Sequence, residues 1–93
     1  MASVDGGGGP PDGMSQELMS LWLAKKGRWD DAHEVAQDIN SPMGFWIHAY
    51  LHRVEGDLGN AGYWYRRADK PSKSTKEGLD DEWREIAEVV LNS

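Results

Sequence analysis

A short sequence block occurs twice in this chain, and this repeat constrains the fold more than any other feature. The two copies read GRWDDA at residues 27–32 and GDLGNA at residues 56–61, an offset of 29 residues. In each copy a glycine that can end one helix precedes residues that can open the next. Beyond the block, Ala36 aligns with Tyr65 and Ile39 aligns with Ala68. Because repeated helical units bury their apolar faces by stacking on one another, the repeat predicts two related helical hairpins.

Apolar side chains recur at helical spacing in five segments, and these set the expected secondary structure. We expect helices at residues 15–26, 29–39, 42–55, 58–69 and 79–92. Their expected N-caps include Ser15, Ser41, Asp57 and Asp80, which are residue types that accept a hydrogen bond from the first helical turn. The pattern therefore predicts an all-α fold, with two antiparallel hairpins and a C-terminal helix that caps them.

The N-terminal stretch has a composition that does not favour a fixed structure. Residues 1–13 read MASVDGGGGPPDG, and glycine loses more backbone freedom on folding than any other residue. We expect a flexible tail over residues 1–13 and a single helical domain over residues 14–93. Five Trp, three Tyr and one Phe lie between Trp22 and Trp83. Each can bury roughly 150–250 Å², so they can supply the core of a small domain.

Composition excludes several classes of function. The chain has no cysteine, which rules out disulfides, thiolate metal ligands and a cysteine nucleophile. Its formal net charge of −6 argues against nucleic acid and anionic membrane surfaces as partners. We find neither a secretory signal nor an apolar run of about 20 residues that could span a bilayer. Since the chain has no cysteine, nothing demands an oxidising compartment, and we expect a cytoplasmic location.

Motifs that would indicate catalysis are missing from the sequence. The glycine run at residues 6–9 lacks the following Lys-Ser/Thr pair of a phosphate-binding loop, and no serine sits in a nucleophile elbow. The acidic residues have no apolar context, and those of the last segment are interpreted as a solvated face (Asp80, Asp81, Glu82, Glu85 and Glu88). We therefore assign no catalytic residue, and a non-enzymatic role is favoured.

The second copy of the repeat resembles a tetratricopeptide unit. Residues 56–57 match the turn between that family's two helices, and Ala61, Tyr65 and Ala68 match its small, aromatic and small positions. The resemblance extends over about residues 15–70, as two divergent units with a shorter period than the family's ~34 residues. The segments WIHAYLH, EGDL and YWYRRA also look like a group of small microbial proteins, a likeness that implies no activity.

The tetratricopeptide resemblance implies a concave surface that holds a peptide or a partner protein. Trp46, Tyr50 and Arg53 would face that surface, and aromatic and arginine side chains are frequent binding hot spots. In the alternative interpretation, Trp46 and Tyr50 belong to the core and are covered by the fifth helix. The first hypothesis is thus a protein- or peptide-binding module. Because two units are few for a repeat fold, self-association into a homo-oligomer is a further expectation.

A second candidate surface lies near the end of the fourth expected helix. Tyr63, Arg66 and Arg67 gather there, and guanidinium groups can hold a carboxylate or a phosphate. The alternative is an exposed helix end, where both arginines complement the helix dipole and pair with nearby acidic side chains.

Histidines provide the alternative functional hypothesis, a metal site. His48 and His52 are one helical turn apart, which lets two imidazoles reach one ion, and His33 and Glu55 could add a third and a fourth ligand. Such a site would hold zinc or another divalent metal and could be hydrolytic. Otherwise we expect no cofactor. The competing interpretation is structural, because the repeat alignment turns both histidines into the second hairpin.

Overall fold

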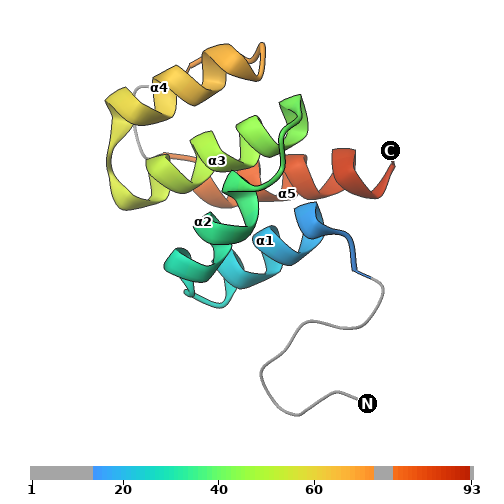
Figure 1. Ribbon diagram of the computed structural model, residues 1–93. Coiled ribbons are helices and arrows are strands. Elements are labelled where there is room, and N and C mark those ends of the chain that lie inside the picture. The colour runs from blue at the N-terminus through green and yellow to red at the C-terminus, as the bar shows by residue number, and fades with distance from the viewer. Residues whose placement is uncertain (1–13, 73–76, 93) are drawn as a thin grey trace.

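The computed structural model describes residues 14–72 and 77–92, which form five α-helices and confirm the all-α prediction (Figure 1). The helices are α1 (Gln16–Lys25), α2 (Trp29–Gln37), α3 (Pro42–Glu55), α4 (Leu58–Arg67) and α5 (Leu79–Leu91). Every observed end lies within two residues of its expected position. In the described part of the chain, none of these helices is long and apolar enough to cross a bilayer. The tail expected at residues 1–13 lies outside the described residues.

Local capping explains where most of the helices begin. The side chains of Ser15, Ser41 and Asp57 each accept a hydrogen bond from a backbone N–H of the following first turn. The expected cap of α5 is wrong, because Asp80 lies inside the helix and Gly78 occupies the N-cap position. Gly78 has a φ of 76°, and this left-handed entry into α5 favours glycine over an acidic capping residue.

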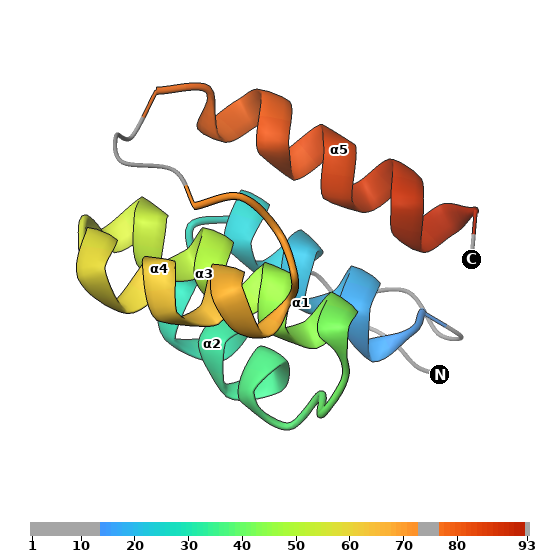
Figure 2. The same cartoon turned by 90° about the horizontal axis from the view of Figure 1, so that it is seen from above.

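Two helix pairs stand side by side, and the fifth helix lies across them (Figures 1 and 2). α1 packs mainly against α2 and α3 mainly against α4, and α2 and α3 join the two hairpins. α5 packs against α1 and α3, the first helix of each hairpin. Repeat-related positions are buried alike, since Ala32 and Ala61 are both 0% exposed.

α3 is the central helix of the fold and contacts all four others. Every residue from Trp46 to Arg53 is buried, as expected for a helix that is apolar almost all round. α3 therefore presents one face to α5 and another to α2 and α4, and this arrangement places the histidines between the hairpins.

A close backbone approach sets the corner between α2 and α3. A Cβ atom added to Gly44 would collide with the carbonyl oxygen of Ile39 and lie only 2.6 Å from the Ile39 Cβ. Glycine is thus needed where the first turn of α3 packs against Ile39, in the connection that follows α2. This connection joins α2, which carries His33, to α3.

We expect Gly44→Ala and Gly59→Ala to change stability in opposite directions. Gly44→Ala forces the corner apart and should lower the free energy of unfolding by about 1–3 kcal/mol. Gly59 is exposed within α4 and has no neighbour that an added methyl group would meet. Gly59→Ala should therefore raise the free energy of unfolding by up to ~1 kcal/mol. Urea denaturation of both variants measures the two effects, and changes of the same sign would contradict this account of the corner.

Candidate metal centre

Three histidines from two helices meet between the hairpins. His33 comes from α2, and His48 and His52 come from successive turns of α3. One ring nitrogen of each lies within 4.8 Å of those of the other two. The docking of α2 on α3 thus brings together the three residues considered for a metal site.

The ring planes are arranged so that two parallel imidazoles face a third at a steep angle. His48 and His52 are nearly parallel, with ring centroids 4.9 Å apart. His33 is inclined at 89° to His48 and at 74° to His52, with centroid distances of 4.5 and 5.2 Å. Zinc–nitrogen bonds of about 2.0–2.1 Å in a tetrahedron place ligand nitrogens roughly 3.3–3.4 Å apart. The three nitrogens, which lie up to 4.8 Å from one another, would therefore have to move closer together to bind one ion.

Two tryptophans enclose the histidines. Trp29 stacks on His33 with a centroid distance of 4.9 Å, and Trp64 stacks on His48 at 4.0 Å. The indole N–H of Trp29 donates to the Leu51 carbonyl oxygen at 2.6 Å, which fixes that ring. These aromatic walls limit rotation of the imidazoles and exclude water from two sides of the cluster.

Burial keeps two of the imidazoles neutral. It lowers the pKa of His48 to about 4, and the nearby charges of His33, His52 and Arg67 act in the same direction. Burial is likewise the main cause that lowers the pKa of His33, and the charge of His52 is the second. Since metals bind the neutral imidazole, protons do not compete for these two nitrogens at neutral pH.

His48 is the residue whose surroundings most need explanation. Its side chain is buried, with 6% of the residue exposed. Within residues 14–72 and 77–92, neither His48 nor His33 makes a hydrogen bond through a ring nitrogen, although both make ring contacts. Buried polar groups nearly always have a partner, and an exception can indicate an ion or a water molecule.

Glu55 orients one of the histidines and does not join the cluster itself. Its Oε2 lies 2.6 Å from Nδ1 of His52, which leaves Nε2 of that ring for a metal. Among the described residues, the group formed by the three histidines includes no carboxylate. Glu55, His52 and Asp57 form a separate group, in which both acids are exposed, and exposed acidic groups are common without an ion. A carboxylate on the second nitrogen of a histidine is typical of metal sites, where it fixes the ring.

The open concave surface predicted at Trp46, Tyr50 and Arg53 is wrong. Their exposed fractions are 4%, 6% and 1%. α5 covers them, as in the alternative interpretation of Trp46 and Tyr50 as core residues. Burial also raises the pKa of Tyr50 to about 12, with the charges of Asp80 and Glu82 acting in the same direction.

A buried carboxylate holds α5 in this place. Glu82 is 2% exposed, accepts a hydrogen bond from the Trp46 indole at 3.0 Å and pairs with the Arg53 guanidinium. The Tyr65 hydroxyl donates to the same carboxylate at 2.6 Å, and burial together with this bond raises the pKa of Tyr65 well above its usual value. The interpretation of Glu82 as part of a solvated face is therefore wrong. Its spacing could have revealed this, because Glu82 shares a helical stripe with buried Ile86 and Val90.

The group near the end of α4 is exposed but does not form the expected ion pairs. Tyr63 is 47% exposed, and Arg66 and Arg67 are also exposed. Among the described residues, neither arginine pairs with a carboxylate. The Arg67 guanidinium instead lies over the Phe45 ring at 4.4 Å and the Trp64 ring at 4.9 Å. For Arg67, cation–π contacts with these aromatic rings take the place of the predicted carboxylate partner.

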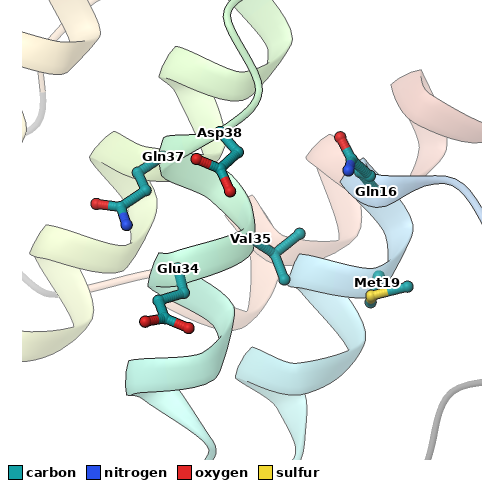
Figure 3. Close-up of a pocket in the computed structure, with 6 residues that line it drawn as sticks. All are labelled: Gln16, Met19, Glu34, Val35, Gln37 and Asp38. Carbon is teal, nitrogen blue, oxygen red and sulfur yellow. The ribbon is translucent and has the colours of Figure 1, made fainter.

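A separate hollow lies between α1 and α2. Figure 3 shows its lining side chains, which are Gln16, Met19, Glu34, Val35, Gln37 and Asp38. The lining combines amides and two acids with two apolar side chains, and it includes none of the three histidines. This surface is therefore distinct from the histidine cluster.

Comparisons of the chain with protein-family models, with curated proteins and with solved structures give no match.

Replacing Glu82 tests the contribution of the buried ion pair. Glu82→Ala leaves Arg53 charged and buried without its main partner, and should lower the free energy of unfolding by about 3–5 kcal/mol. Glu88→Ala, an exposed acid of the same helix, serves as the control and should change it by less than ~0.5 kcal/mol. Guanidinium denaturation measures both variants. A Glu82→Ala loss no larger than that of Glu88→Ala would contradict the assigned role of Glu82.

The low pKa of His48 predicts that the folded chain loses stability in acid. Between pH 6.5 and 4 the unfolded chain binds a proton at this residue and the folded chain does not, so stability falls as pH is lowered through this range. In the presence of a chelator, the chain should lose roughly 2–3 kcal/mol more over this range than a His48→Leu variant. Urea denaturation at a series of pH values measures the difference, and parallel pH profiles for the two proteins would contradict it.

Proposed function

We propose that this chain binds one divalent transition-metal ion, zinc before others, through His33, His48 and His52. The observation that carries the proposal is His48, a buried imidazole with no hydrogen-bond partner among the described residues and two further histidines beside it. A metal ion bound by all three rings would satisfy these nitrogens together.

The chemistry of the donor set favours this kind of ion. Imidazole nitrogens suit zinc, copper, nickel and iron, whereas calcium and magnesium prefer oxygen ligands. Zinc sites with three protein ligands commonly use histidine. The carboxylate of Glu55 on Nδ1 of His52 supplies the outer contact that such ligands usually have.

A metal at this position would link the two hairpins, because its ligands come from α2 and α3. An ion that binds the folded chain and not the unfolded chain stabilises the fold by mass action, by about 2.7 kcal/mol at a hundred times its dissociation constant. Structural consolidation of the hairpin pair is therefore one direct effect of the proposed ion.

Metal binding replaces peptide binding as the leading hypothesis. The protein-binding hypothesis depended on Trp46, Tyr50 and Arg53, and these side chains are buried beneath α5. The exposed end of α4, with Tyr63, Arg66 and Arg67, is the part of that hypothesis that stays open to a partner.

Calorimetric titration of the chelator-treated full chain with Zn²⁺ tests the proposal. We expect one ion per chain and a rise in melting temperature on binding. His33→Gln should abolish tight binding, because it removes one ligand at a position that is only partly buried. Asp57→Asn is the matched control, since it removes an acid of the neighbouring group while asparagine still caps α4.

The two variants also locate the ion. Loss of binding in His33→Gln with retention in Asp57→Asn supports the histidine site. Retention in His33→Gln with loss in Asp57→Asn would place the ion among the acids and overturn the proposal, as would the absence of any binding to the unaltered chain.

A further inference from the structure

The proposed site has three ligands from the described chain and no fourth. The cluster formed by His33, His48 and His52 includes no acidic side chain. Glu55, the nearest candidate suggested by the sequence, is outside this group and contacts Nδ1 of His52. Structural zinc sites are closed by four protein ligands, whereas sites with three protein ligands keep an open position for water or substrate.

The three histidines differ in their exposure to solvent. His48 and His52 are each 6% exposed, while His33 is only partly buried. Trp29 and Trp64 stack on two of the rings and so close their outer faces. A ligand from solvent would thus arrive on the His33 side and would have to be small.

The local charge favours an anion. Three imidazole ligands leave both charges of a divalent ion uncompensated, and Glu55 offsets part of this through His52. Arg67 adds positive charge on the α4 side of the site. Its guanidinium is held over the Trp64 ring that stacks on His48. Electrostatic attraction is strong where aromatic walls exclude water.

We propose that the metal ion held by His33, His48 and His52 keeps one coordination position that binds a small anionic oxygen or nitrogen ligand, such as hydroxide, a short carboxylate or azide. This inference rests on the proposed metal site. It assigns Arg67 the role of a positioning residue, which strengthens anion binding by its charge without contacting the metal.

Cobalt replacement provides the test, because tetrahedral Co²⁺ has visible absorption bands that respond to a change of ligand. The chelator-treated full chain is loaded with Co²⁺ and titrated with sodium azide, and with sodium acetate in a second series, at constant ionic strength. We expect a saturable change in the bands with one anion bound per metal. Sodium sulfate at the same ionic strength is the control and should leave the bands unchanged.

A pair of variants tests the role of Arg67. Arg67→Gln should bind Co²⁺ and respond to azide with roughly two- to fivefold weaker affinity, as expected for one partly screened charge. Arg84→Gln, an exposed arginine of α5 that pairs with Asp81, should match the unaltered chain. Equal azide affinities in all three proteins would overturn the role given to Arg67.

The outcomes separate this inference from the metal site itself. Co²⁺ uptake with bands that do not respond to azide or acetate would mean that the chain itself completes the coordination, which overturns the open position and leaves the metal site standing. No Co²⁺ uptake would overturn both.

Discussion

The carboxylate of Glu82 lies in the interior of the protein, where an unpaired charge would cost several kcal/mol. It is tolerated because Arg53, Trp46 and Tyr65, from α3 and α4, all direct donors at it. These donors are in place only when α5 lies across the hairpins in one register. Sliding α5 by a turn would leave both Glu82 and Arg53 buried without each other, so this interaction selects a single arrangement of the fifth helix.

Because α3 supplies donors to Glu82 on one side only, its two faces differ in chemistry. Trp46, Tyr50 and Arg53 follow each other at spacings of four and three residues and face α5. His48 lies two positions after Trp46, about 200° around the helix, and therefore faces α2 and α4. One face of the helix presents donors to a buried anion, and the other presents neutral nitrogens that can accept a cation.

Local features of the fold could be predicted from the sequence, but the contacts of individual side chains could not. Ser41 before Pro42 is sufficient to start α3, because capping involves only neighbouring residues. The meeting of His33 with His48 depends on the corner at Gly44, where the backbone approach is visible only once the helices are packed. We missed the burial of Glu82 because we gave its charge more weight than its position on the apolar stripe of α5. For Arg67 both alternatives also considered only its charge, and neither included the aromatic rings of Phe45 and Trp64 that it contacts.

The uninterrupted burial of residues 46–53 has a consequence for how this sequence can vary. On most helices, positions that tolerate substitution alternate with positions that do not, at the period of the helix. Here eight consecutive residues are enclosed, some by the ion pair beneath α5 and others by the histidine cluster between the hairpins. A substitution at one residue of this segment alters buried contacts, because no side chain in the segment faces solvent. We therefore expect substitutions in this segment to be accompanied by compensating substitutions in the helices that pack against it, α2 on one side and α5 on the other.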